Sequence, residues 1–137
     1  MMLDLSVFRG TSREECAILV GSVHDGMWHV SGMVRVTNRA ARNVDYAIAG
    51  ADYIRVVETL KGTPYQVIGF LHTHLPQHDA LPTQSDIDGV FYKASINAVF
   101  HPASGVVTWY TSQGVIGEEA VLCDFTVERG FAPGRVG

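Results

Sequence analysis

The sequence predicts a mixed α/β fold in which helices pack against one central β-sheet. Segments rich in β-branched residues alternate with amphipathic segments, in the order strand, strand, helix, strand, helix and then further strands. A chain of 137 residues suits one domain and can bury a core without disulfides or a structural metal. The apolar fraction of 47% and the charged fraction of 18% are those of a globular protein. We therefore expect one domain over residues 1–129, followed by a flexible tail over residues 130–137.

The first two strands are predicted at residues 15–23 and 28–36, because both segments are apolar and β-branched. Between them, His24, Asp25 and Gly26 form a turn signal of the kind that closes a β-hairpin. The two strands should therefore be antiparallel neighbours.

The first helix is predicted at residues 52–61, where apolar residues recur at helical spacing and Gly62 provides a stop. Residues 66–74 follow as a nearly continuous apolar strand, which indicates burial on both faces in the middle of the sheet. Two prolines exclude regular structure from the loop at 75–82.

A second helix is predicted at residues 84–93, and its apolar side chains should face the core. These side chains are Ile87, Val90 and Phe91. Glycine and proline turns then separate the remaining strands, which are expected at residues 95–100, 106–111 and 121–127.

Charge and composition exclude several classes of partner. The net charge of −4 gives no electrostatic reason to expect a nucleic acid or an anionic membrane surface. No apolar run approaches the roughly 18 residues that span a bilayer, and the first residues lack the pattern of a secretory signal, so the cytoplasm is the expected location. Cys16 and Cys123 form no Cys-x-x-Cys motif and are expected to be buried free thiols.

Two histidines at the end of a predicted strand form the strongest functional signal. Side chains two residues apart in a strand share a face, so His72 and His74 can reach one point beyond the strand end, and Asp86 can return a carboxylate to it after the loop. Two imidazoles and one carboxylate fill three tetrahedral positions around Zn²⁺ and leave the fourth for water, as in catalytic zinc sites. The alternatives are two core histidines, and a helix capping box formed by Thr83 and Asp86.

A catalytic zinc site also needs a carboxylate that activates the bound water without binding the metal. Glu14 is the candidate, because it stands just ahead of the first strand, where its side chain can point across the site. Glu15 is the alternative base. The other histidines lack a second ligand at short spacing and are expected at the surface or in turns, although His78 belongs to the loop near the metal: these are His24, His29, His78 and His101.

With these residues in place, the sequence resembles the JAMM metallopeptidases of the Jab/MPN (Mov34) family, in particular their small prokaryotic branch. The resemblance rests on the motifs Glu14-x-x-Ala-Ile-x-x-Gly, His72-x-His74 and Pro-Thr83-x-x-Asp86, and covers most of the chain. It implies the MPN fold, a cytidine-deaminase-like α/β sandwich with a mixed central sheet and flanking helices. It also implies that His72, His74 and Asp86 bind zinc, that Glu14 is the general acid/base, and that Thr83 helps to stabilise the oxyanion.

The sequence departs from the family pattern in three ways. Thr83 replaces a serine, and the spacer after the second histidine is one residue longer than usual. An alternative register, Ser85-x-x-Asp88, restores the serine but lengthens the spacer further. Only 13 residues precede Glu14, where family members place a strand and a helix, so an apolar sheet face could stay open for a partner or a second copy.

The resemblance implies a zinc-dependent peptidase or isopeptidase that hydrolyses the bond after the C-terminal glycine of a ubiquitin-like or sulfur-carrier protein, with water activated by zinc and Glu14. The implied partner is the tail of such a protein, and a homo- or hetero-oligomer is compatible with the pattern. The alternative is a non-catalytic MPN scaffold, although scaffolds of the family usually lack one or more of these residues. A nucleotide deaminase would need His-x-Glu and Cys-x-x-Cys motifs, and the sequence has neither.

Overall fold

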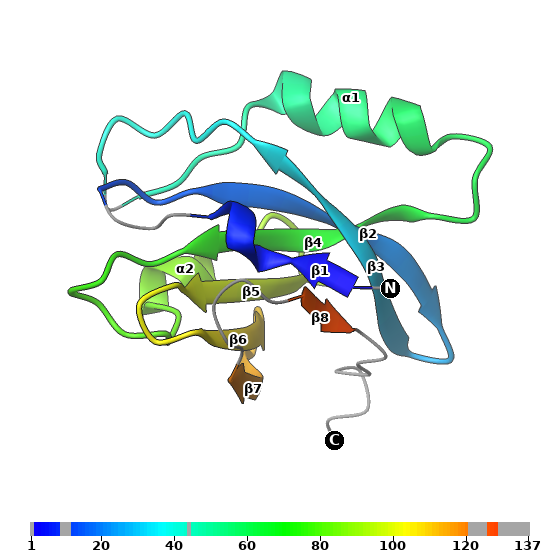
Figure 1. Ribbon diagram of the computed structural model, residues 1–137. Coiled ribbons are helices and arrows are strands. Elements are labelled where there is room, and N and C mark those ends of the chain that lie inside the picture. The colour runs from blue at the N-terminus through cyan, green and yellow to red at the C-terminus, as the bar shows by residue number, and fades with distance from the viewer. Residues whose placement is uncertain (1, 9–11, 44, 121–125, 129–137) are drawn as a thin grey trace.

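A six-stranded mixed β-sheet forms the centre of the protein in the computed structural model (Figure 1), which describes residues 2–8, 12–43, 45–120 and 126–128. The strand order is β3-β2-β4-β5-β6-β7, in which β4 and β5 are parallel and every other neighbouring pair is antiparallel. This arrangement confirms the predicted mixed α/β class. The strands are β2 (Cys16–His24), β3 (Met27–Val36), β4 (Gln66–Thr73), β5 (Ile96–His101), β6 (Val106–Thr111) and β7 (Gly114–Ala120).

Helices and a small second sheet flank this central sheet. The helices are α1 (Gly50–Leu60), α2 (Gln84–Asp88) and the 3₁₀ helix η1 (Leu5–Val7). In the second sheet, β1 (Met2–Asp4) pairs antiparallel with β8 (Thr126–Glu128). Even α1, with 11 residues, is too short for a bilayer, and no helix in the described part of the chain could cross a membrane.

The predicted first helix and five of the predicted strands are confirmed, with boundaries that differ by two residues at most. The hairpin between β2 and β3 forms at the predicted turn. There Asp25 and Gly26 both have positive φ angles, of 52° and 73°, as a type I′ turn requires.

The predicted second helix is too long. α2 ends at Asp88, because Gly89 caps it and donates its amide proton to the Ser85 carbonyl oxygen at 2.9 Å. The chain then leaves helical geometry, and Phe91 is 65% exposed, so the expectation that Phe91 faces the core is wrong.

The C-terminal strands differ from the expectation as well. β7 was not predicted at all, and its residues form the edge of the sheet next to β6. Of the strand predicted at 121–127, only Thr126 and Val127 lie in the described residues, where they belong to β8. The expected domain end at 129 and the tail at 130–137 lie outside the described residues.

The central sheet buries apolar side chains on both faces. On one face, Leu19, Leu71 and Trp109 pack with Leu5 and Phe8 from the N-terminal segment. Leu5 and Phe8 are 3% and 5% exposed. The chain's own first residues therefore cover this part of the sheet, and the expectation of an open face does not hold here.

The opposite face carries α1. There Cys16, Ile18 and Phe70 pack against Val56 of that helix. Cys16 is fully buried, as expected for a free thiol, and burial raises its pKa to about 11. Cys123 lies outside the described residues.

The parallel pairing of β4 with β5 requires glycine at position 69. A Cβ on Gly69 would lie 1.4 Å from the carbonyl oxygen of Ile96, which is far too close for two atoms that are not bonded to each other. The absence of a side chain lets β4 and β5 approach closely in the register that places His72 opposite Val99. The position of the histidine pair therefore depends on Gly69.

Replacing Gly69 by alanine should destabilise the fold, because the added methyl group and the Ile96 carbonyl cannot both keep their positions. We expect the free energy of unfolding to fall by about 3 kcal/mol or more, at the upper end of overpacking effects. Gly32→Ala in β3 is the matched control, since a Cβ there meets nothing within 4 Å. Urea denaturation followed by circular dichroism measures both variants, and equal stability would contradict the role of Gly69.

Candidate metal centre

The end of β4 places His72 and His74 on one face of the sheet, as the sequence predicts. Both side chains are buried, at 0% and 3% exposed. Hydrogen bonds from both neighbouring strands hold their backbone, because the Thr73 amide donates to the Glu15 carbonyl oxygen at 2.9 Å and the His74 amide to that of Phe100 at 3.0 Å. Hydrogen bonds on both sides therefore fix the backbone of the histidine pair, at the end of a strand that lies between β2 and β5.

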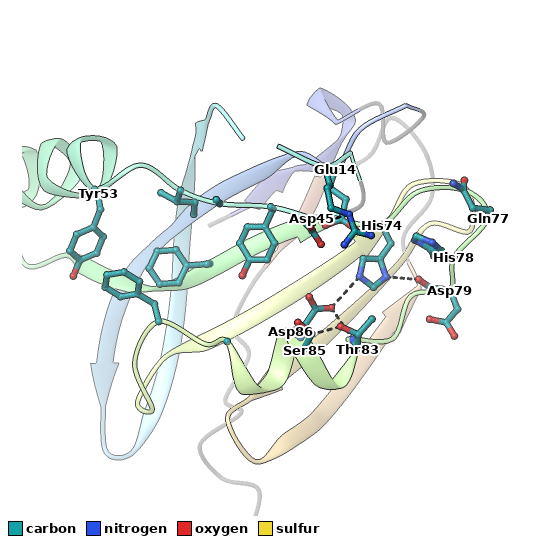
Figure 2. Close-up of a pocket in the computed structure, with 18 residues that line it drawn as sticks. Glu14, Asp45, Tyr53, His74, Gln77, His78, Asp79, Thr83, Ser85 and Asp86 are labelled. Carbon is teal, nitrogen blue, oxygen red and sulfur yellow. Dashed lines mark hydrogen bonds and ion pairs between the residues drawn. The ribbon is translucent and has the colours of Figure 1, made fainter. Parts of the chain in front are cut away.

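The N-terminus of α2 brings Asp86 to these histidines. Thr83 and Asp86 form a capping box, in which Thr83 Oγ1 accepts from the Asp86 amide at 3.0 Å and Asp86 Oδ2 accepts from the Thr83 amide at 2.8 Å. The same Oδ2 lies 3.4 Å from His72 Nε2 and 3.3 Å from His74 Nε2. Figure 2 shows the capping box and the contact with His74 on one side of the cleft. Capping and ligand geometry, considered above as alternatives, occur together.

Within the described residues, the group that can hold a metal ion consists of His72, His74 and Asp86, whose ligand atoms lie within 4.8 Å of one another. Two atoms bound to one tetrahedral ion at about 2.0–2.1 Å lie about 3.3 Å apart, which matches the two distances to Oδ2. An imidazole and carboxylate set of this kind suits a divalent transition metal.

The ring nitrogens are arranged for metal binding. His74 Nδ1 lies 2.9 Å from the Asp79 carbonyl oxygen, which can only accept a proton, so Nδ1 is the donor and, in the neutral imidazole, Nε2 carries the lone pair that a metal would bind. Both ring nitrogens of His72 are buried and make no hydrogen bond within the described residues. The closest polar contact of His72 is the 3.4 Å approach of its Nε2 to Asp86 Oδ2, and a cation bound beside these two atoms would satisfy the buried imidazole better than that contact does.

Burial and hydrogen bonding shift the pKa values of the three candidate ligands in different directions. Burial lowers the pKa of His72, which favours the neutral imidazole that metals bind. Burial also acts to lower the pKa of His74, but hydrogen bonds with Asp86 and the Asp79 carbonyl outweigh it and raise that pKa. For Asp86, burial acts to raise the pKa, yet the two histidines hold it well below its usual range. Asp86 is therefore the anionic member of the group.

Glu14 lies two residues before β2 and lines the same cleft as His74 and Asp86. It is only 4% exposed, and burial raises its pKa to about 8, although the nearby His74 partly offsets that rise. Glu15 instead forms an ion pair with Arg35, with Oε2 3.0 Å from Nη2. Of the two glutamates, the structure brings Glu14 to the candidate metal ligands.

Asn38 fixes the backbone that carries Glu14, a role that the sequence did not reveal. Its Nδ2 donates to the carbonyl oxygens of Glu14 and Asp45, each at 2.8 Å. Its Oδ1 accepts from the amides of Ala40 and Ala47 at 2.9 and 3.0 Å, so both ends of the amide are bonded. The partners are up to 24 residues away, and no local pattern identifies them.

Tyr46 was also missed. Its ring stacks on that of His72, with centroids 4.2 Å apart and planes inclined by 14°. The Tyr110 ring contacts His72 edge-on, at 6.5 Å and 89°. Two aromatic rings thus fix the orientation of a ligand whose nitrogens have no hydrogen bond in the described part of the chain.

The structure also places the alternative ligand Asp88 and two of the remaining histidines, His78 and His101. Asp88 Oδ1 accepts a hydrogen bond from Gln84 Nε2 at 2.8 Å, and Asp88 is exposed. His78 lies near the candidate ligands, as expected, with its ring centroid 5.9 Å from that of His74. His101 is only 7% exposed and lies 2.6 Å from Ser104 Oγ through Nδ1, so its expected surface position is wrong.

The candidate centre opens into a cleft of about 1320 Å³. Figure 2 shows Glu14 on one wall and Thr83 and Asp86 on the other, with His74 between them. Of the candidate ligands, His74 and Asp86 therefore border the cleft that Glu14 lines, while His72 is buried behind them. Thr83 and Ser85 both line this cleft.

Comparisons with known proteins bear on the fold alone. No protein-family model matches the sequence, and no curated protein matches it. Among solved structures, the chain is similar to a protein of Desulfitobacterium hafniense, with a TM-score of 0.65 and 17% identity over 88% of this chain and 82% of that one. It is also similar to a protein of Salinibacter ruber, with a TM-score of 0.56 and 23% identity over 85% and 84% of the two chains.

Titration of chelator-treated protein with zinc should show one tight site per chain. Asp86→Ala removes a ligand, so we expect its zinc affinity to fall by at least about 100-fold, at or beyond the upper end of the effects of outer-shell changes. Asp88→Ala is the matched control and should bind as the unchanged protein does. The opposite result, with zinc kept in Asp86→Ala and lost in Asp88→Ala, would show that Asp88 is the ligand, in the Ser85-x-x-Asp88 register.

Glu14→Gln should stabilise the metal-free protein at neutral and alkaline pH. The pKa of Glu14 is raised from 4.5 to about 8 on folding, so the stability that Glu14 contributes is fully present below about pH 4.5 and is lost as the pH rises toward 8. Glutamine has no such proton to release. Thermal unfolding in chelator should therefore show a small difference in Tm between the two proteins near about pH 5 and a larger one near about pH 8. A difference that does not change with pH would contradict the burial of an ionisable Glu14.

Proposed function

We propose that this protein is a zinc-dependent metallopeptidase of the JAMM type with an MPN fold. The observation that carries the proposal is the meeting of two features in one cleft. Three candidate ligands, His72, His74 and Asp86, converge on one point, and a buried carboxylate that is not part of that group, Glu14, lines the same space. The sequence motifs of the family fall on these same residues.

Zinc is the metal that the ligand set favours. Two imidazoles and one carboxylate form a three-ligand zinc site with an open fourth position, which is the pattern of catalytic rather than structural zinc. The hydrogen bond from His74 Nδ1 to the Asp79 carbonyl oxygen is the kind of outer contact that orients a ligating imidazole. When bound, zinc would supply a water molecule of lowered pKa and a positive charge near the substrate carbonyl.

Glu14 carries the proton in this proposal. A general base works best when its pKa lies near the working pH, and burial raises that of Glu14 to about 8. Glu14 would take a proton from the attacking water and deliver it to the leaving amine. Asn38 keeps the backbone of Glu14 in place for both steps through its hydrogen bond to the Glu14 carbonyl oxygen.

Thr83 would stabilise the oxyanion. Its hydroxyl oxygen accepts the Asp86 amide proton, and the hydroxyl proton remains free to donate. Thr83 also lines the cleft on the wall opposite Glu14 (Figure 2). A hydrogen-bond donor at this position stabilises the transition state more than the ground state, because negative charge develops on the substrate oxygen in the transition state.

The substrate class follows from the family resemblance. We propose the C-terminal tail of a ubiquitin-like or sulfur-carrier protein, cleaved after its last glycine. Glycine suits the position next to the metal ligands, because only a residue without a side chain lets the backbone approach them closely. A non-catalytic scaffold has less support, since such a protein has no need to retain three ligands and a buried Glu14 together.

Cleavage of a ubiquitin-like fusion that ends in Gly-Gly before a reporter peptide tests the proposal. Zinc-loaded Glu14→Gln should keep its metal and lose about 10²–10⁴-fold in kcat/KM, as expected for removal of a general base. Thr83→Ser should keep activity, whereas Thr83→Val should lose about 10²-fold, because valine removes the hydroxyl donor. Valine also removes the oxygen that caps α2 and positions Asp86, so zinc content is measured beside activity, and the oxyanion role requires that Thr83→Val keep its zinc. Full activity of metal-loaded Glu14→Gln would rule out the proposed mechanism, and inactive wild-type protein with bound zinc would favour the scaffold.

A further inference from the structure

Five buried side-chain atoms make no hydrogen bond within the described residues, and they lie on three adjacent strands. They belong to four residues, which are His72 on β4, His101 on β5, and Thr108 and Tyr110 on β6. These side chains are between 0% and 7% exposed. None of the four lines the cleft that Glu14 borders, so this buried polar cluster lies outside the proposed substrate site.

Strand pairing places the buried polar cluster on one face of the central sheet. Residues next to its members in sequence, such as Leu71 and Trp109, belong to the core on the opposite face. In the pairing register, Val99 lies between His72 on one side and Thr108 on the other. The backbones of His72 and Thr108 are therefore about 10 Å apart, which is twice the strand spacing.

Ring contacts bring Tyr110 to His72. The centroids of the two rings are 6.5 Å apart, with the planes at 89°. The hydroxyl group of Tyr46 lies close to that of Tyr110, but the two do not reach hydrogen-bond geometry. At such separations, one bridging water molecule can bond both the His72 imidazole and a hydroxyl group of the cluster.

His72 needs an acceptor for its second nitrogen when a metal is bound. Nε2 lies 3.4 Å from Asp86 Oδ2, so Nε2 is the candidate ligand atom and Nδ1 carries the proton. Metal-binding imidazoles almost always donate this second proton, as His74 does to the Asp79 carbonyl oxygen. His72 Nδ1 has no such partner in the described chain, which leaves the unpaired hydroxyl groups on the same sheet face to supply one.

Water is the ligand that fits these atoms. Unpaired buried polar groups in a native fold usually mark an ordered water or ion, and a buried water makes about three hydrogen bonds. The cluster offers the His72 Nδ1 donor and two hydroxyl groups that can donate or accept. His101 Nε2, diagonally across from Thr108 in the pairing of β5 with β6, adds a further polar atom. The cluster contains no carboxylate, so it suits a neutral water molecule better than a second cation.

We propose that Thr108 and Tyr110 are positioning residues for His72, and that they act through an ordered water molecule bonded to His72 Nδ1. The water fixes the tautomer and the direction of the imidazole, so that Nε2 is presented to the metal. This positioning role rests on the proposed function, whereas the water site depends on the buried atoms alone.

A crystal structure of the zinc-loaded protein gives the direct test. We expect electron density for a water molecule at about 2.8–3.0 Å from His72 Nδ1, bonded also to Thr108 Oγ1 or Tyr110 Oη. A direct bond from Nδ1 to a protein acceptor, or no density beside Nδ1, would overturn the proposal.

The stability of the metal-free protein tests the water site in solution. Thr108→Val and Tyr110→Phe each remove one hydroxyl group with little change in volume. If these groups bond a water molecule, each variant loses a hydrogen bond, and its Tm in chelator should fall by about 2–5 °C. If the site is dry, each variant instead loses an unsatisfied polar group, and an unchanged or higher Tm in both would overturn the proposal.

Zinc affinity tests the positioning role. Thr108→Val and Tyr110→Phe should bind zinc about 10–100-fold more weakly, as expected when a ligating imidazole loses its outer contact. Thr108→Ser keeps the hydroxyl group and should bind zinc as the unchanged protein does. Thr111→Val is the matched control, because it removes the hydroxyl group of a threonine at the end of the same strand, and it should also bind normally. Unchanged affinity in both hydroxyl-free variants would overturn the positioning role.

These measurements separate the water site from the proposed function. If both variants lose stability in a protein that binds no zinc, the water site is supported and the proposed metal centre is wrong. If the protein binds zinc and cleaves the fusion, but neither variant changes its Tm or its zinc affinity, the proposed function is supported and the water site is wrong.

Discussion

The candidate site depends on one carboxylate oxygen. Asp86 Oδ2 accepts the Thr83 amide proton and lies within 3.4 Å of both His72 Nε2 and His74 Nε2. The first contact begins α2, and the other two join α2 to the end of β4. A helix of five residues has little stability of its own, so these contacts and the capping box hold it in place. Anything that moves Asp86 therefore disturbs the local fold and the ligand group together.

The other half of the site is built into the sheet. Gly69 lets β4 approach β5 closely, and the resulting register fixes where His72 and His74 emerge. Tyr46 then stacks on the buried ring of His72 from a different part of the chain. The ligands thus stand on packed strands rather than on a loop, and such support keeps a metal site close to its working geometry in the metal-free state.

Features with a local cause could be predicted from the sequence. The His72 and His74 pair follows from the two-residue repeat of a strand, and the contact of Thr83 with Asp86 follows from the three-residue spacing of a capping box. The preference for Asp86 over Asp88 as a candidate ligand came from the family resemblance. The turn at Asp25 and Gly26 follows from its short sequence for the same reason. The mixed sheet itself was predictable because its strands carry strong β-branched patterns.

Features that depend on residues far apart in the sequence could not be predicted. Asn38 acts through partners up to 24 residues away, and Tyr46 meets His72 only after folding. The helical pattern continued past Gly89, but the glycine ended α2 and left Phe91 exposed. β7 was missed because its glycines and adjacent acidic residues have low strand propensity, and pairing with β6 outweighs it.

The two acidic residues of the site occupy opposite electrostatic environments. Two imidazoles hold the pKa of Asp86 well below its usual range, so Asp86 stays anionic and suits a cation. Burial raises the pKa of Glu14 to about 8, so Glu14 can hold or release a proton near neutrality. Where an enzyme needs one carboxylate to bind a metal and another to transfer a proton, the fold must separate their pKa values in this direction. The roles proposed for the two carboxylates, metal ligand and proton carrier, therefore agree with where each is buried and what it contacts.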